Sequence, residues 1–501
     1  MPYEERLLLS EAEAIGTVRN KTDSKLNVVI AGSGVERVLS RLHRLTYFSH
    51  FSIGSGPLIP TQQFLLETTA NGNVSAGRQS TRYSTHGLHD YKGKFHPQIA
   101  RFLMGQAGLT TESLVLDPFA GSGTVLVEAV HYGCNAIGVE ANPLAVLVAN
   151  AKLRLLTCTD DDFRRFRKSI VDCIASLRGR RGLDELANEL GIGDRSREYL
   201  ACWFAPAVLS LLLEFRASCR SRLSREWSPV ADAILSSIAR EVSHQDPADL
   251  RIRRRKAPLK EAPVTALLDK AVSTLLARAA AARNLFGGAP TFAAEFLGDS
   301  RKLSSALASA GAKRFDAIIT SPPYATALPY IDTCRLSLVL VGLCSASDLR
   351  RLEKGQIGNR EISASERKQA ENSMESKLVA FPKELQTFIR GLVRKLRGSE
   401  AGFRKLNMPA LLVQYFCDIH EVLEHTYRVS NRAAHAYWLV GPNRTQVSGE
   451  WLQVDTPRWI AAMAEQVGFT THLDVLDTYQ RFGLHERNGI REEFLISMMP
   501  C

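Results

Sequence analysis

Residues 114–129, LVLDPFAGSGTVLVEA, decide the fold expected for this chain. An apolar run ends in Asp117, a turn of small residues follows, and apolar residues then recur at helical spacing. A second apolar run, NAIGVE at 135–140, comes next, so the stretch predicts a strand, a helix and a second strand of a parallel sheet. Gly121 and Gly123 let the backbone approach a ligand at the carboxyl end of a strand, where open α/β sheets bind nucleotide-like molecules.

The glycine turn differs from those of two other nucleotide-binding families. GSGT is not followed by Lys, so the GxxxxGK loop of the NTPases is absent, and the GxGxxG turn of the dinucleotide enzymes is absent too. Glu140 ends the second predicted strand, where a carboxylate can accept both hydroxyls of a ribose. A surface acid after a strand is the alternative, but the position of Glu140 relative to the glycine turn favours the ribose role.

A second motif lies in FDAIITSPPYATALPY, residues 315–330, where an apolar strand runs directly into four special residues. The two prolines fix the backbone and remove two amide donors, so carbonyl oxygens there can face a ligand amine. A proline-rich turn that closes a strand is the alternative. Its pairing with the glycine turn upstream favours a catalytic role for Ser321, Pro322, Pro323 and Tyr324.

Together, the two motifs resemble those of the DNA amino-methyltransferases, the family that makes N4-methylcytosine and N6-methyladenine. The family's cofactor loop is similar to DPFAGSGT, and its catalytic tetrapeptide, variable in the first residue, is similar to SPPY. The resemblance covers about residues 81–155 and 291–500. It implies an α/β fold, namely a Rossmann-like class I methyltransferase with a mixed seven-stranded sheet plus a largely helical insertion, and S-adenosylmethionine as the cofactor.

The resemblance also implies where the cofactor binds. Glu140 would hold its ribose, and Asp299 in LGDSR would bind near its adenine ring. Residues 86–104, HGLHDYKGKFHPQIARFLM, resemble the family's remaining cofactor segment, which closes over the methionine. The residues expected to bind the cofactor are Lys94, Phe95, His96, Pro97, Asp117, Pro118, Phe119, Gly121, Gly123, Thr124, Glu140, Asn142 and Asp299.

The reaction that the resemblance implies must activate a poor nucleophile, because the lone pair of an exocyclic amine is delocalised into its base. The Ser321 side chain and the Pro322 carbonyl would accept the two N–H bonds and align the nitrogen with the methyl sulfonium for direct displacement. The base must leave the duplex, and Tyr324 would stack on it. In this family Ser in the first position is associated more with cytosine N4, and Asp or Asn with adenine N6, so cytosine N4 is favoured.

Composition is consistent with a nucleic-acid partner. The 501 residues carry a formal net charge of +11, and their 45% hydrophobic and 23% charged content is that of a globular protein. The densest cationic cluster lies in DLRIRRRKAPLK at 249–260. A solvated loop is the alternative to phosphate contact there. The residues expected to bind DNA are Arg253, Arg254, Arg255 and Lys256.

The layout predicts a split catalytic domain. Residues 81–150 and 291–501 would form the methyltransferase domain, and 151–290 a helical insertion that is a candidate target-recognition domain. The cationic stretch at about 325–410 is a rival for that role, and we expect both regions to contact phosphates. Residues 1–80, with a strand-like VVIAG at 28–32, carry no motif that assigns a role.

Several classes of protein are disfavoured. No apolar run is long enough to span a bilayer, and the first residues carry acids where a signal peptide carries bases, so we expect a cytoplasmic protein without membrane contact. The nine cysteines form no CxxC pair, and His86, His89 and His96 have no completing acid at metal spacing, so we expect no metal. The expected partner is double-stranded DNA, with a cognate restriction endonuclease or defence proteins as further candidates. The alternatives are an RNA base amino-methyltransferase and an inactive cofactor-binding subunit of a restriction or defence complex.

Overall fold

A computed structural model describes most of the chain. The described residues are 2–21, 26–29, 35–69, 81–91, 93, 95–246, 249, 252–286, 291–308, 310–311, 314–325, 331–360, 362–397, 402–447, 450–478 and 492–501. Among these residues, no helix combines the length and the apolar character needed to cross a membrane.

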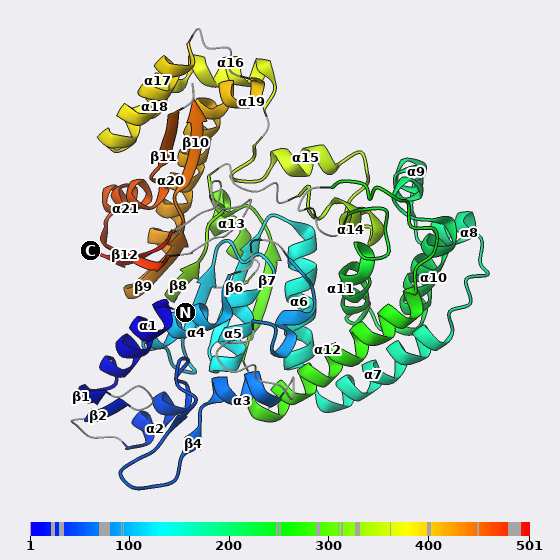
Figure 1. Ribbon diagram of the computed structural model, residues 1–501, viewed down its shortest axis with the longest axis horizontal. Coiled ribbons are helices and arrows are strands. Elements are labelled where there is room, and N and C mark those ends of the chain that lie inside the picture. The colour runs from blue at the N-terminus through cyan, green and yellow to red at the C-terminus, as the bar shows by residue number, and fades with distance from the viewer. Residues whose placement is uncertain are drawn as a thin grey trace.

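Seven strands form the central sheet (Figure 1). They are β5 (Leu114–Asp117), β6 (Asn135–Glu140), β7 (Ala293–Leu297), β8 (Phe315–Thr320), β9 (Ser430–Val440), β12 (Phe469–Thr478) and β13 (Glu492–Pro500). Their order is β12–β13–β9–β8–β5–β6–β7, and β9, β8, β5, β6 and β7 are parallel. Strand β13 runs antiparallel to both of its neighbours. This order confirms the expected fold, a Rossmann-like class I methyltransferase with a mixed seven-stranded sheet.

The strand order reverses between β5 and β8. From β5 the chain continues outward to β6 and β7, whereas β8 and β9 lie on the other side of β5. In open α/β sheets, ligands bind outside the carboxyl ends of the strands at such a reversal, which we call the β5–β8 crevice. Both sequence motifs follow these strands.

Helices cover both faces of the sheet, because side chains of successive residues point to opposite faces. Val115, Ala317 and Tyr437 face a core shared with α4 (Pro97–Gln106) and α5 (Thr124–Tyr132). Leu116 and Trp438 face the other core, which α13 (Leu303–Ala308), α20 (Met408–Val429) and α21 (Thr456–Val467) complete. The short first helix, α1 (Pro2–Glu13), packs on α4 and β12.

A largely helical segment separates β6 from β7 in the sequence and lies at one side of the sheet (Figure 1). After α6 (Pro143–Thr157) it comprises α7 (Asp160–Ala175), α8 (Leu183–Glu189), α9 (Asp194–Trp203), α10 (Pro206–Arg222), α11 (Ser228–Ala239) and α12 (Val264–Phe286). Its core also takes in α6 and α14 (Arg335–Leu340), including fully buried Ala145 and Leu340. The insertion is thus joined to the rest of the fold by packing.

A second helical region follows the tetrapeptide and lies at the opposite side of the sheet (Figure 1). It contains α16 (Ala364–Asn372), α17 (Met374–Leu378), α18 (Lys383–Leu396) and α19 (Phe403–Leu406), together with the hairpin of β10 (Asn443–Val447) and β11 (Glu450–Val454). Helix α15 (Leu349–Lys354) lies between this region and the insertion (Figure 1), and its Leu349 is buried in the insertion's core. Buried Leu385 and Ile389 seat α18 against α20.

The N-terminal region adds small elements. They are the hairpin of β1 (Thr17–Lys21) and β2 (Leu26–Val29), α2 (Val35–His43), the pair β3 (His50–Phe51) and β4 (Ile59–Pro60), and α3 (Gln62–Thr69). Strand β2 includes the first two residues of the strand-like VVIAG, and residues 30–32 of that run lie outside the described residues.

Candidate cofactor and catalytic site

The glycine turn needs its small residues for close packing. Gly121 and Gly123 have φ values of +57° and +75°, in the region that side chains disfavour. A Cβ added to Gly123 would lie 2.6 Å from the Cβ of Ala149, on α6. The turn can therefore pass close to α6 before α5 begins at Thr124.

Asp117 links the turn to the strand that carries the tetrapeptide. Its buried Oδ1 accepts a hydrogen bond from the Thr320 hydroxyl at 2.5 Å and another from the Phe119 amide at 3.0 Å. Burial raises the pKa of Asp117 to about 7, although these two bonds oppose the shift. Because Thr320 directly precedes Ser321, the two motifs are in contact across β5 and β8.

Glu140 holds the turn from the neighbouring strand. Its Oε2 accepts the Gly121 amide at 3.0 Å, and its Oε1 accepts the Asn142 amide at 2.8 Å. Burial raises the pKa of this carboxyl. Each carboxylate oxygen has a second lone pair, so Glu140 retains the capacity to accept the two hydroxyls of a ribose.

Asn142 and Tyr91 close the turn from another direction. The Asn142 side chain caps α6 by accepting the Leu144 amide at 3.1 Å, and its Nδ2 donates to the Tyr91 hydroxyl at 3.2 Å. A Cβ on Gly121 would lie 3.7 Å from the Tyr91 ring. The segment that precedes α4 therefore reaches the glycine turn through Tyr91, a residue not singled out from the sequence.

The other residues expected in this segment have different settings. Phe95 packs against the core between the sheet and α4, His96 is the residue before α4, and Pro97 is its first residue. Lys94 lies outside the described residues. The cofactor roles of these four residues stay predictions.

A cavity of about 430 Å³ lies beside Asp299, at the carboxyl ends of β6 and β7. This size falls in the range of small-ligand pockets. One wall comes from the two strand ends, and the other comes from the segment around α15. The lining residues include Ala141, Pro143, Leu297, Asp299, Leu343, Leu352 and Gln356. The sequence pointed to Asp299 alone, since residues 343–356 carry no recognisable motif.

Asp299 itself is tightly paired. Arg301 Nη2 donates to Asp299 Oδ2 at 2.7 Å, and Arg301 Nε reaches Oδ1 at 2.9 Å. Burial acts to raise the pKa of Asp299, but the bonds from Arg301 outweigh it and the pKa is lowered. Asp299 is therefore a carboxylate at neutral pH and can accept a ligand N–H with a remaining lone pair.

Two hydrogen bonds connect the tetrapeptide to neighbouring elements. The Tyr415 hydroxyl donates to the Pro323 carbonyl at 2.8 Å, and the Tyr324 hydroxyl donates to Glu493 Oε1 at 2.9 Å. Within the described part of the chain, no hydrogen bond is recorded for the Ser321 hydroxyl or for the Pro322 carbonyl. These are the two acceptors that the sequence assigns to the amine.

A further acid lies beneath the turn. Glu295 on β7 is buried, and a Cβ on Gly123 would lie 3.4 Å from its Oε2. Burial raises the pKa of Glu295 well above its usual range, and the charges of Glu140 and Asp117 add to the shift. Lys152, also buried, donates to the Ser122 carbonyl at 2.5 Å. Neither residue was expected, because an acid inside a strand carries no motif.

Three buried residues, His86, Glu128 and His131, bring possible metal ligands together among the described residues. His86 Nε2 lies 2.6 Å from Glu128 Oε1, and His131 Nδ1 lies 3.3 Å from the same oxygen. Ligands 2.0–2.1 Å from a tetrahedral zinc ion would lie roughly 3.3 Å apart. The shorter distance is that of a hydrogen bond, and Tyr83 donates to the same oxygen at 2.8 Å. The cluster is a hydrogen-bonded anchor between α5 and the segment around Tyr83.

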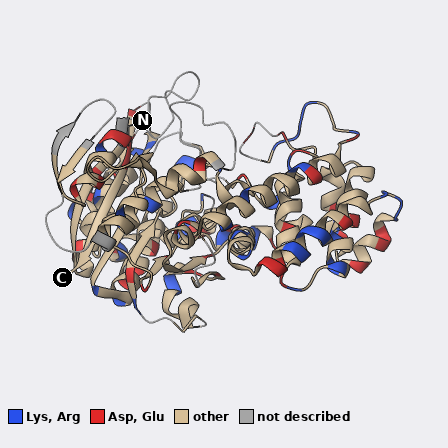
Figure 2. Ribbon diagram, turned by 90° about the horizontal axis from the view of Figure 1, so that it is seen from below, with Lys and Arg blue, Asp and Glu red and all other residues tan. Residues whose placement is uncertain are grey.

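The cationic cluster in the insertion is partly committed to internal contacts. Arg255 donates to the carbonyls of Ser243 and Gln245, each at 3.0 Å, and Arg254 donates to the Cys202 carbonyl at 2.9 Å. Arg253 pairs with Asp249 at 3.0 Å, and Lys256 is exposed. Figure 2 shows both signs of charge interspersed over the helices of the insertion. DNA contact by Arg253, Arg254, Arg255 and Lys256 stays a prediction.

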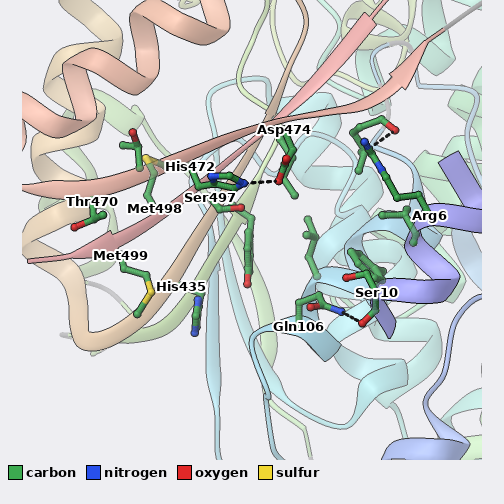
Figure 3. A pocket seen from close by; sticks show the side chains of 17 residues that line it. Arg6, Ser10, Gln106, His435, Thr470, His472, Asp474, Ser497, Met498 and Met499 are labelled. Atoms are coloured by element: carbon green, nitrogen blue, oxygen red, sulfur yellow. Dashed lines mark hydrogen bonds and ion pairs between the residues drawn. The ribbon is translucent and has the colours of Figure 1, made fainter. Parts of the chain in front are cut away.

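A separate hollow of about 390 Å³ lies between α1, α4 and the strands β9, β12 and β13 (Figure 3). His472 pairs with Asp474 at 3.1 Å on its β12 side, and Arg6 donates to the Leu476 carbonyl at 2.9 Å. None of the residues expected to bind cofactor or base lines this hollow. Of these two cavities, only the one at Asp299 is therefore lined by residues expected to bind the cofactor.

Comparison with known proteins points to the same region. Residues 88–170 match the family model of an RMKL-like methyltransferase domain. Over 313 residues the chain is 25% identical to the type II methyltransferase M.BsoBI of Geobacillus stearothermophilus, an alignment that covers 58% of each protein. Over 111 residues it is 32% identical to the type II methyltransferase M.MjaII of Methanocaldococcus jannaschii, covering 22% of this chain and 20% of that protein. The aligned part of each relative is thus less than two thirds of its length.

Proposed function

We propose that this chain, which belongs to the S-adenosylmethionine-dependent methyltransferases by its sheet and its sequence matches, methylates the exocyclic amine of a base in DNA. Cytosine N4 is favoured over adenine N6, because the tetrapeptide begins with Ser. The bond between Asp117 and Thr320 carries the proposal, since it joins the glycine turn to the residue before Ser321. Cofactor and base would meet at the β5–β8 crevice.

The residues present fit S-adenosylmethionine, which supplies a methyl group on a positively charged sulfur. The cavity at Asp299 has room for a base, and the carboxylate of Asp299 offers an acceptor for an exocyclic N–H. Glu140 offers two oxygens to a ribose, and the turn at Gly121 brings backbone close to the ligand. A cationic ligand beside Asp117 and Glu140 would favour their charged forms and so lower the raised pKa of both carboxyls.

The tetrapeptide would activate the amine. Ser321 and Pro322 present a hydroxyl and a carbonyl that can accept its two N–H bonds, which draws the nitrogen toward tetrahedral geometry. S-adenosylmethionine held beside the amine would supply the methyl group to this nitrogen, and the proton that the amine gives up would pass to solvent. Tyr324, anchored at its hydroxyl by Glu493, offers its ring face to the flipped base.

Contact with the duplex falls to the two helical regions on either side of the sheet. The insertion contributes the exposed Lys256. The region after the tetrapeptide contributes Lys383 and Arg394 on α18 and Arg397 directly after it, all three exposed. Cations on both sides of the crevice would hold the phosphate backbone while the base enters the site. We propose that both regions contact phosphates, and the insertion stays a candidate target-recognition domain.

The proposal is tested by incubating the full chain with labelled S-adenosylmethionine and unmethylated duplex DNA, followed by nucleoside mass spectrometry. N4-methylcytosine is the expected product, and Ser321→Ala is the matched variant in which its yield should fall. N6-methyladenine would correct the base, while label in total RNA but not in DNA would replace the substrate. Cofactor binding without transfer to either nucleic acid would identify an inactive subunit.

A further inference from the structure

Arg301 connects three separate parts of the fold beside the cavity. Besides Asp299, its guanidinium donates to Asp418 Oδ1 on α20 at 3.2 Å and to the Gly355 carbonyl at 2.9 Å. Gly355 ends α15 and lines the cavity. Burial acts to lower the pKa of Arg301, but its carboxylate partners outweigh this and raise it, so the side chain is always charged. Arg301 therefore fixes both the carboxylate and the facing wall of the cavity.

Helix α20 extends this connection to the tetrapeptide. Tyr415 and Asp418 are three residues apart on α20 and hence lie on one face of the helix. Both side chains are buried, at 1% and 5% exposure for the two residues. Tyr415 holds the Pro323 carbonyl at 2.8 Å, as Asp418 holds Arg301. One turn of α20 thus contacts both the arginine beside the cavity and the tetrapeptide.

The segment from Gly355 to Gly358 makes a second connection. Gly355 is bonded to Arg301, and three residues later Gly358, with a φ of +79°, lies against the tetrapeptide. A Cβ on Gly358 would lie 3.5 Å from Pro323 Cβ and 3.5 Å from the Tyr324 carbonyl. Buried Ile357 anchors the segment in the core under α20. The cavity wall and the tetrapeptide are therefore parts of one packed unit.

We propose that Arg301 and Tyr415 are positioning residues that act through α20. Arg301 fixes the shape of the cofactor cavity, Tyr415 fixes the backbone of the tetrapeptide, and the helix couples the two. This inference rests on the proposed function of the site as a methyltransferase centre. Tyr415 fixes the peptide unit after Pro323, and because proline restricts the backbone on both sides, the directions of the Pro322 carbonyl and of Ser321 follow. Neither residue touches the reacting atoms.

The test uses three single variants of the full chain. Tyr415→Phe removes one hydroxyl, Arg301→Lys keeps the charge but loses the planar fork, and Tyr427→Phe is the control. Tyr427 lies on the same helix and contacts Phe469, and within the described residues no hydrogen bond is recorded for its hydroxyl. Cofactor affinity is read by calorimetry with S-adenosylmethionine alone, and methyl transfer by single-turnover kinetics on duplex DNA.

We expect a split between the two readouts. Tyr415→Phe should slow transfer about tenfold, or about 1.4 kcal/mol, with the Kd for S-adenosylmethionine unchanged. Arg301→Lys should weaken the Kd about tenfold and slow transfer at saturating cofactor by less than that. Tyr427→Phe should change neither quantity. Equal loss of affinity and rate in Tyr415→Phe, or no loss of either, overturns the assignment.

Hydrogen exchange tests the coupling without any DNA. The amides of Ser321, Tyr324 and Ala325 should exchange faster in Tyr415→Phe and also in Arg301→Lys, which lies outside the tetrapeptide. Unchanged exchange in Arg301→Lys overturns the role of α20. If the wild-type chain binds the cofactor but methylates no DNA, the proposed function fails, while calorimetry and exchange still decide this inference.

Discussion

Gly123→Ala separates the two demands that the structure makes on the glycine turn. The first is the positive φ, which costs a residue with a side chain roughly 1–2 kcal/mol. The second is space, because the new Cβ would lie 2.6 Å from Ala149 Cβ and 3.1 Å from Ala149 Cα. Overpacking of this kind costs about 1–3 kcal/mol. We therefore expect a total loss of about 2–5 kcal/mol in the free energy of unfolding.

Gly133→Ala is the matched control for the first demand alone. Gly133 ends the same helix, α5, with a φ of +84°, and the nearest atom to its added Cβ is 3.7 Å away. Urea titrations monitored by tryptophan fluorescence would compare the two variants, and calorimetry would measure their Kd for S-adenosylmethionine. Gly123→Ala should be the less stable and bind the cofactor at least about tenfold more weakly. Equal stability losses, or unchanged cofactor binding in Gly123→Ala, would refute the reasoning.

Three further predictions concern the site and the DNA surface. Ser321→Ala should lower kcat about 10²-fold, as loss of one positioned hydrogen-bonding group does, without changing the Kd for the cofactor; an unchanged kcat would exclude Ser321 from the mechanism. Because burial raises the pKa of Asp117 from 3.8 to about 7, the folded state loses stability as the pH rises through that range. The Tm of Asp117→Asn relative to that of the wild type should therefore be higher at pH 8 than at pH 5. A difference in Tm that does not depend on pH would contradict the raised pKa. Lys256→Ala should weaken duplex binding and lower by about 1 the slope of log affinity against log salt concentration. An unchanged slope would exclude a phosphate contact by Lys256. Arg255→Ala should instead lower Tm, because the Arg255 guanidinium donates hydrogen bonds to backbone carbonyls.

The parts of the fold that could be predicted are those whose residues are apolar and contiguous. LVLD, NAIGVE and FDAIIT are largely buried on both sides of the sheet, so each is a mostly apolar run with a polar end, Asp316 being the polar residue inside the third. Strand β12, FTTHLDVLDT, lies at the edge of the sheet and mixes apolar with polar residues. Its sequence is therefore difficult to distinguish from that of a loop. The hairpin strands NRTQV and EWLQV are equally polar.

The residues of the candidate site also divide into those that the sequence could predict and those that it could not. Asp117, at the end of a strand, and Ser321, directly after one, could be named because the strand pattern gives their position at the carboxyl edge, and Asp299 could be named from the family resemblance. Arg301 and Tyr415 could not, since their partners Asp418 and Pro323 lie 117 and 92 residues away in the sequence. Contacts of that range are set by packing, and one sequence contains no signal for them.

The position of the insertion also bears on how the chain folds as it is made. Ala136 of β6 pairs with Ala293 of β7, although the whole insertion is synthesised between them. Until that segment folds against α6, the outer edge of β6 is an unpaired strand, the kind of surface on which chains aggregate. Folding of the insertion draws its two ends together and lowers the entropic cost of adding β7. Substitutions in its buried core should therefore reduce the yield of folded protein at the ribosome, even where they leave every residue of the catalytic crevice untouched.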